Sequence, residues 1–298
     1  MKNILTAIIA AAVTFTFTVA FILKKMFLGT DIHVFGGDAD PEDKDWLEKN
    51  GYKRTYLISR DGYCLHGLII DNGSADWAVL AHGYDADAKS MAGYARRFVE
   101  KGFSVLMPDQ RGYGRSGDNE TTMGHLECYD MIDWSNKLIN ERNAKNITLF
   151  GVSMGAATVM LCADKKLPEQ VRCIVEDCGY SSIREEFEHN MRQVMNLPPY
   201  PFLWAVDIIT RISKGWSILR DADCVKAVKK AGVPMLFIHG EDDDFVPYSM
   251  HRKLYDACRR KDKEKLTVKG AKHTEACVID PETYSEKVFG FIEKHSVK

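Results

Sequence analysis

The chain has 298 residues, of which 45% are hydrophobic, and its formal net charge is −2 at pH 7. This length and apolar content are sufficient for a full hydrophobic core, and the chain after its N-terminal region is expected to form one large domain. Because the sequence has no long basic tract, it lacks the electrostatic footprint of nucleic-acid binding. It also lacks metal-ligand spacing and a phosphate loop with its lysine, so no cofactor and no metal are expected.

The N-terminal region predicts a membrane anchor. Residues 4–23 are uncharged and mainly apolar, and as a helix they would cover the ~30 Å hydrocarbon core of a bilayer. Residues 23–26, Leu-Lys-Lys-Met, lack the small-x-small pattern of signal cleavage, which favours an uncleaved anchor within residues 1–27. Scattered cysteines without metal spacing suit reduced thiols, and they favour the cytoplasmic face of the membrane. Residues 28–53 are interpreted as a linker and entry helix.

Two strand-like segments at 56–58 and 65–70 are expected to form a hairpin, after which strands and helices alternate. Further strands are expected near Val79, Val105, Leu149, Val175, Phe237 and Thr267, and helices over 94–101, 129–143, 156–164, 249–261 and 281–294. Such alternation predicts an α/β fold with a mostly parallel sheet covered by helices on both faces.

One loop along this alternation carries the string Gly-x-Gly-x-x-Gly over residues 112–117. In dinucleotide-binding enzymes this string follows a strand directly and opens a helix. Here four residues, 108–111, separate it from the preceding strand, and the acidic residues 118–120 follow it. A nicotinamide enzyme is therefore the weaker alternative.

The most informative segment is Gly-Val-Ser-Met-Gly at residues 151–155, between a predicted strand and a predicted helix. A nucleophile on such a turn adopts a strained backbone conformation, and flanking glycines remove side chains that would collide with the strand and helix. Ser153 would stand at the helix N-terminus, where the backbone N–H of Met154 faces negative charge on an attacked carbonyl.

A base and an acid follow in the order that this turn requires. His273 comes after the strand near Thr267, and three adjacent aspartates, 242–244, come after the strand near Phe237. Ligands bind at the carboxyl edge of a parallel sheet, so these loops can converge on Ser153. Asp177, at the end of another strand, is an alternative acid. His273 would take the serine proton, and the acid would orient the imidazole ring.

The stretch between Asp177 and the strand near Phe237 is too long for one crossover helix and is rich in bulky apolar residues. A proline-rich corner at 198–201 predicts two helices, which we interpret as a cap over about 181–222 that forms an apolar acyl pocket. In a peptidase, an acid of this cap would bind a free amino terminus. The acids available for that role are Glu185, Glu186 and Glu188.

These motifs together resemble the α/β-hydrolase superfamily, in its serine aminopeptidase and acylglycerol lipase-like branch. The family's His-Gly-x-x-Asp-x-x-Val-Pro loop matches residues 239–247, its His-Gly-x oxyanion strand-end matches 82–84, and its Asp-x-Arg-Gly-x-Gly-x-Ser segment matches 109–116. The resemblance covers roughly residues 54–298. It implies the α/β-hydrolase fold, with a mostly parallel eight-stranded sheet and a helical cap.

The resemblance also assigns roles to residues. It selects Asp243 among the aspartates, so the implied catalytic set is Ser153, Asp243 and His273. The implied oxyanion donors are the backbone N–H groups of Tyr84 and Met154, while His82 supports the site structurally.

The expected function is therefore hydrolysis of a carboxylic ester, from a small-molecule acyl ester or lipid, through an acyl-enzyme. A serine aminopeptidase, an acyltransferase and a non-catalytic membrane-tethered binding module remain alternatives. The oligomeric state does not follow from the sequence.

Overall fold

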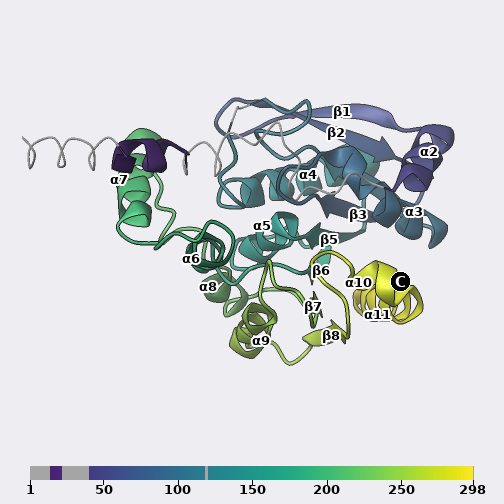
Figure 1. Ribbon diagram of the computed structural model, residues 1–298. Helices are drawn as coiled ribbons and strands as arrows, with labels where there is room; N and C mark the ends of the chain where they lie inside the picture. The colour runs from purple at the N-terminus through teal and green to yellow at the C-terminus, as the bar shows by residue number, and fades with distance from the viewer. Residues whose placement is uncertain (1–13, 22–39, 118–119, 298) are drawn as a thin grey trace, which may run out of the picture.

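The fold is built on a central sheet, and the computed structural model describes residues 14–21, 40–117 and 120–297. Within these residues the sheet has eight strands in the order β1-β2-β4-β3-β5-β6-β7-β8 (Figure 1). The strands are β1 (Lys53–Ile58), β2 (Cys64–Ile70), β3 (Asp76–Ala81), β4 (Ser104–Pro108), β5 (Asn146–Val152), β6 (Val171–Asp177), β7 (Met235–Gly240) and β8 (Glu264–Val268). β2 pairs antiparallel with β1 and β4, and the other pairs are parallel. The predicted α/β-hydrolase fold is confirmed.

Helices cover both faces of this sheet, as predicted. They are α2 (Pro41–Asn50), η1 (Ala88–Met91), α3 (Ala92–Glu100), α4 (Glu127–Arg142), α5 (Met154–Cys162), α6 (Ile183–Gln193), α7 (Phe202–Lys214), α8 (Cys224–Val228), α9 (Tyr248–Ala257), α10 (Ala276–Ile279) and α11 (Pro281–His295). Buried side chains of α2, α3, α10 and α11 form the core on one face, and those of α4, α5, α8 and α9 form the core on the other.

The two cores follow from the alternation of side chains along each strand. In β3, Val79 faces the core that contains α4 and α5, whereas Ala78 and Leu80 face the opposite one. Every residue of β5 is buried, and so is every residue of α5. The turn that joins β5 to α5 therefore lies at the centre of the molecule.

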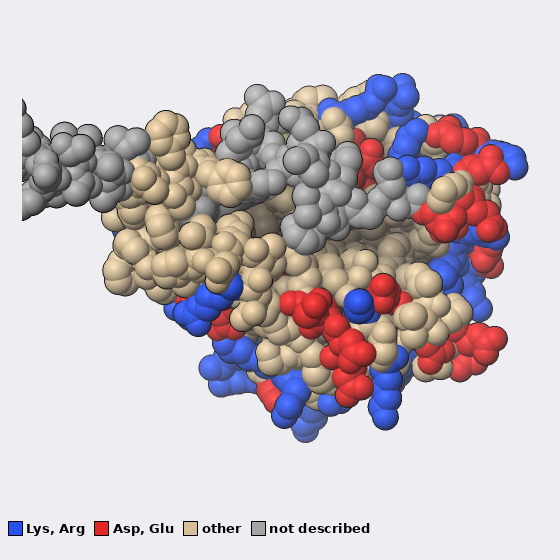
Figure 2. Space-filling view, in the orientation of Figure 1, with Lys and Arg blue, Asp and Glu red and all other residues tan. Residues whose placement is uncertain are grey.

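Between β6 and β7 the chain forms α6, α7 and α8. Three prolines lie in the corner between α6 and α7, where a helix cannot continue. The outer face of α7 is apolar and exposed; Trp204, Ile208, Ile209 and Ile212 form it. Figure 2 shows this end of the molecule almost without charged groups, in contrast to the charged surface around α2 and α9.

The prediction of a single-pass membrane anchor within residues 1–27 is wrong. Within the part of the chain that the structure describes, no helix is long and apolar enough to cross a membrane. Of the predicted span 4–23, only the helical segment 14–21 is described. Its Phe15 ring stacks on Phe202 of α7, with ring centroids 5.2 Å apart. The rest of the span, and residues 22–39 of the predicted anchor and linker, lie outside the described residues.

The Gly-x-Gly-x-x-Gly string lies in the loop after β4 and does not open a helix, because the next helix in the described chain is α4. A carboxylate holds this loop instead. Asp109 Oδ1 accepts a hydrogen bond from the backbone N–H of Ala88, and Oδ2 accepts one from Arg115. An added Cβ on Gly114 would lie 2.3 Å from the Asp109 carboxyl carbon. The glycine is needed for close packing on Asp109, which argues against the dinucleotide alternative.

Candidate active site

Ser153 occupies a strained turn between β5 and α5. Its φ of 56° lies in a region that residues with a Cβ rarely adopt. The flanking glycines allow this tight turn: a Cβ on Gly151 would lie 2.1 Å from the carbonyl oxygen of Gly155, and one on Gly155 would lie 2.0 Å from that of Ala81. The predicted strand-turn-helix therefore has a steric basis, and it brings Ser153 to the N-terminus of α5.

Three loops that are distant in sequence meet at this turn. Nε2 of His273 lies 2.9 Å from Ser153 Oγ, and Nδ1 of the same ring lies 2.7 Å from Asp243 Oδ2. Ser153 follows β5, Asp243 follows β7 and His273 follows β8, so all three lie at the carboxyl edge of the parallel strands. The structure thus brings together the three side chains that the sequence selected.

The Asp243 carboxylate is held on both of its oxygens. Oδ1 accepts the backbone N–H groups of Phe245 and Val246 at 3.0 and 2.9 Å, which fixes the loop after β7. Burial opposes ionisation, but the hydrogen bonds and charges of His239 and His273 outweigh it and lower the pKa of Asp243 to about 2. An ionised carboxylate only accepts hydrogen bonds, so Nδ1 of His273 carries a proton, and in the neutral ring the lone pair is then on Nε2, toward Ser153.

His239 is a second histidine beside this carboxylate, and sequence reasoning used it only as part of a motif. Its Nε2 lies 3.3 Å from Asp243 Oδ2 and 2.8 Å from the carbonyl oxygen of Val246. Since a carbonyl only accepts, Nε2 carries a proton that it shares with both oxygens. Its position at the end of β7, four residues before the acid, was the available signal.

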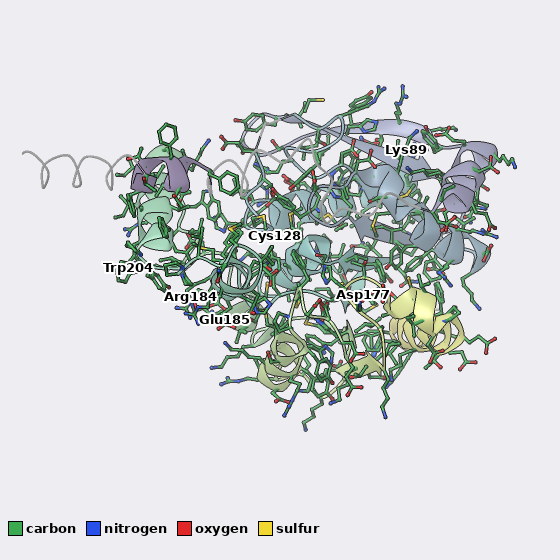
Figure 3. The ribbon with its side chains drawn as sticks, in the orientation of Figure 1. Lys89, Cys128, Asp177, Arg184, Glu185 and Trp204 are labelled. Atoms are coloured by element: carbon green, nitrogen blue, oxygen red, sulfur yellow. The ribbon has the colours of Figure 1, made fainter. Side chains whose placement is uncertain are left out.

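Asp177, the alternative acid, has a different partner. Its Oδ2 accepts a hydrogen bond from the Tyr284 hydroxyl at 2.7 Å, while its Oδ1 has no hydrogen-bond partner. Burial raises the pKa of Asp177 to about 6, against the opposing effect of the Tyr284 hydrogen bond. Figure 3 shows Asp177 on the side of the sheet where α10 lies. Asp177 and Asp243 both lie near His273, but only Asp243 has a hydrogen bond to the ring.

The loop after β3 passes directly beside Ser153. An added Cβ on Gly83 would lie 3.5 Å from Ser153 Cβ and 4.0 Å from its Oγ. The next residue is Tyr84, and Met154 begins α5 on the other side of the serine. Their backbone N–H groups belong to the two segments that flank the hydroxyl, which is the arrangement needed for an oxyanion hole.

His82 supports this loop from below. Its Nδ1 lies 2.7 Å from the Gly83 carbonyl oxygen, and its Nε2 accepts the backbone N–H of Gln110 at 2.9 Å. The Gln110 side chain donates to the His82 carbonyl and accepts from the Thr158 hydroxyl of α5. Burial lowers the pKa of His82, so the ring is neutral with its proton on Nδ1. This network joins the Gly83 loop to the helix that carries Ser153.

A cavity of about 240 Å³ opens at Ser153 and His273. The Phe245 ring packs against His273, with ring centroids 4.9 Å apart, so one wall is apolar. The cavity is lined by Asp40, Asp43, Gly83, Tyr84, Ala86, Ser90, Met91, Gly93, Tyr94, Arg97, Val152, Ser153, Phe245, His273, Thr274, Cys277 and Val278. It is large enough for a small acyl group and has both apolar and charged sides.

The three cap acids have different environments. Glu185 accepts a hydrogen bond from Ser181 and pairs with Lys253, and Glu188 accepts one from the Tyr200 hydroxyl. Glu186 is buried, and its Oε2 has no hydrogen-bond partner. Burial raises the pKa of Glu186 to about 8, with an opposing contribution from its bond to Asn190.

The sequence matches the model of a known protein family. The family described as serine aminopeptidase, S33, matches residues 74–220 and 205–276. The chain belongs to this family of α/β-hydrolases. Its match begins just before β3 and includes Ser153, Asp243 and His273.

Two relatives and one solved structure can be aligned with half or more of this chain. An uncharacterized protein of Bacillus subtilis, YqkD, is 26% identical over 297 residues, which is 97% of this chain and 94% of its own length. A lysophosphatidylserine lipase of Macaca fascicularis, ABHD12, is 28% identical over 52% of this chain and 37% of its own length. The Pyrococcus furiosus esterase Pf2001 has the same fold, with a TM-score of 0.70 and 22% identity over 88% of this chain and 98% of its own.

Proposed function

We propose that this α/β-hydrolase cleaves a carboxylic ester with an acyl or lipid-like group through a Ser-His-Asp triad. One observation carries the proposal: Ser153, His273 and Asp243 form a continuous hydrogen-bonded chain of 2.9 and 2.7 Å. This is the chain that a serine nucleophile needs, because its hydroxyl must lose a proton to a base whose positive charge is then stabilised.

In the proposed reaction Ser153 Oγ attacks the ester carbonyl carbon and His273 Nε2 takes its proton. The negative carbonyl oxygen is bound by the backbone N–H groups of Tyr84 and Met154. His273 then gives the proton to the leaving alcohol, which leaves an acyl-enzyme. A water molecule attacks that acyl group, and His273 again acts as base and then as acid, which returns Ser153 to its free form.

The ester class is supported by the cavity and by relatives. Phe245, Val278 and Met91 give the cavity apolar lining beside Ser153. One relative is a lysophosphatidylserine lipase, and a protein of the same fold is an esterase. The aminopeptidase alternative needs an acid that binds the free amino terminus, but Glu185, Glu186 and Glu188 are all absent from the described residues that line this cavity. Because the pKa of Glu186 is raised to about 8, that residue would also have to ionise before it bound an ammonium group.

Labelling with a fluorophosphonate probe tests the nucleophile. The wild-type chain is expected to be labelled, and Ser153→Ala and heat-denatured protein are not. A series of p-nitrophenyl esters of increasing chain length then measures the acyl pocket. Unlabelled wild-type protein with a native circular dichroism spectrum would reject the triad and favour a binding module. Labelling without ester turnover, together with release of p-nitroaniline from amino-acid anilides, would favour the peptidase.

A further inference from the structure

Cys178 lies next to the proposed triad, although sequence reasoning gave it no role. It directly follows Asp177 at the end of β6, and its backbone has a φ of 53°. Its side chain is buried and forms no disulfide. The positive φ turns the chain at the same carboxyl edge of the sheet where Ser153, Asp243 and His273 lie.

The Cys178 thiol is part of a compact donor set. One ligand atom each from Cys178, Asp243 and His273 lie within 4.8 Å of one another. Thiolate sulfur, imidazole nitrogen and carboxylate oxygen are together the ligands that Zn²⁺ binds in proteins, and Cd²⁺ shares the preference for soft sulfur. A catalytic zinc site commonly has three such protein ligands and one open position.

We propose that a thiophilic divalent cation, Zn²⁺ or Cd²⁺, binds between Cys178, Asp243 and His273 and inhibits the hydrolase. The inhibition rests on the function proposed above, whereas the binding does not. The bond between Asp243 and His273 is already 2.7 Å long without an ion, so the cation competes with the triad's own hydrogen bond.

The donors need only a small movement to reach a metal ion. With bonds of about 2.3 Å to sulfur and about 2.0–2.1 Å to nitrogen and oxygen, tetrahedral ligands lie roughly 3.3–3.7 Å apart. The observed limit of 4.8 Å is about an ångström larger. His273 is the donor expected to move, because its ring is partly exposed and lines the cavity, whereas Asp243 and Cys178 are buried. An ion would therefore meet His273 first.

Binding removes the base in either orientation of the ring. If the ion takes Nε2, the lone pair that faces Ser153 is consumed. If it takes Nδ1, the proton of that nitrogen moves to Nε2, which then donates and cannot accept the serine proton. In both cases the Cys178 thiol gives its proton to solvent, Asp243 binds as the carboxylate, and no electrons are transferred.

Inhibition is measured with the full chain, a p-nitrophenyl ester and a titration of ZnCl₂ after treatment with EDTA. Cys178→Ala removes the thiolate, and we expect its half-inhibitory zinc concentration to rise at least about tenfold, as losing a metal ligand weakens affinity. Cys277→Ser is the matched control, because Cys277 is also buried and lines the cavity but is not in the donor set. It should keep wild-type zinc sensitivity. Equal sensitivity of Cys178→Ala and wild type would overturn the proposal, and so would activity that is lost in EDTA and restored by zinc.

A second readout does not depend on activity. Cd²⁺ bound to thiolate absorbs in the ultraviolet, so Cd²⁺ is added to Ser153→Ala and to the double variant Ser153→Ala/Cys178→Ala. Ser153→Ala should gain the ultraviolet absorbance of one Cd²⁺–thiolate bond that the double variant does not gain. The same spectrum in both would reject the site even if the ester assay fails. A Cys178-dependent band without ester turnover would instead keep the metal site and reject the proposed function.

Discussion

The Asp243 carboxylate and the His273 ring are joined by a 2.7 Å contact, and the same carboxylate oxygen lies 3.3 Å from a second ring, that of His239. Two histidines therefore converge on one acid, while its other oxygen accepts two backbone N–H groups. These partners donate hydrogen bonds to the carboxylate and so stabilise its ionised form. It can orient His273 without taking up a proton.

Asp243→Asn is predicted to lower kcat severely, by up to about 10⁴-fold, because the amide can favour the wrong tautomer of His273. Asp177→Asn should have a much smaller effect, since its hydrogen bond is to Tyr284. The rates are measured with one p-nitrophenyl ester, and circular dichroism checks both folds. An inactive Asp177→Asn beside a nearly unaffected Asp243→Asn would show that the acid is misassigned.

Glu186 should make the folded chain less stable as the pH rises. Its folded pKa is raised to about 8 from the usual 4.5, so between these values the folded state holds a proton that the unfolded state has lost. The free energy of unfolding falls across this window, by an amount on the order of a few kcal/mol. Glutamine does not ionise, so Glu186→Gln removes this fall in the free energy of unfolding. Urea unfolding at pH 5 and pH 8.5 should therefore show a smaller decrease in the variant than in wild type.

Glu286→Gln is the control for this measurement, because Glu286 is an exposed carboxylate of α11. It should keep the wild-type pH dependence. An unchanged pH dependence in Glu186→Gln would mean that the carboxylate is hydrated in the folded chain.

Gly155→Ala and Gly290→Ala are predicted to have opposite effects on stability. A Cβ on Gly155 would lie 2.0 Å from the Ala81 carbonyl oxygen and 2.6 Å from that of His82, so β3 and α5 must move apart. We expect a loss of several kcal/mol or failure to fold. A Cβ on Gly290, within α11, meets no atom within 4 Å, and alanine is the better helix former by about 1 kcal/mol. Thermal unfolding of both variants checks the contrast, and an equal effect would contradict the packing of α5 on β3.

Most of the sheet could be predicted because strand and helix periodicities alternate clearly after residue 56. The convergence of the loops that follow the strands could also be predicted, because the carboxyl ends of parallel strands lie at one edge of the sheet. The roles of Ser153, Asp243, His273, Tyr84 and Met154 stay predictions that the experiments above address. The predicted anchor was wrong because no helix of the described residues is long and apolar enough to span a membrane, and hydropathy over 4–23 does not reveal that Phe15 stacks on Phe202 of α7.

Other parts of the site were not accessible from the sequence for physical reasons. Family resemblance selected Asp243 among three adjacent aspartates, but residue pattern alone could not, because the choice depends on which carboxylate meets the backbone N–H groups of Phe245 and Val246. His239 belongs to the motif at 239–247, but its 3.3 Å contact with Asp243 is not part of that pattern. Cys178 belongs to no motif, and its proximity to Asp243 and His273 follows from distances between different strands.

The backbone of Ser153 has a consequence for natural selection on this fold. A residue with a Cβ at a φ of 56° and a ψ of −117° costs about 1–3 kcal/mol, and this strain is present in every folded molecule. Ser153→Gly should therefore give an inactive chain that unfolds at a higher temperature than wild type, whereas Ser153→Ala keeps the strain. With Ser153 as the proposed nucleophile, selection for stability alone would favour glycine at this turn, and selection for chemistry would oppose that change.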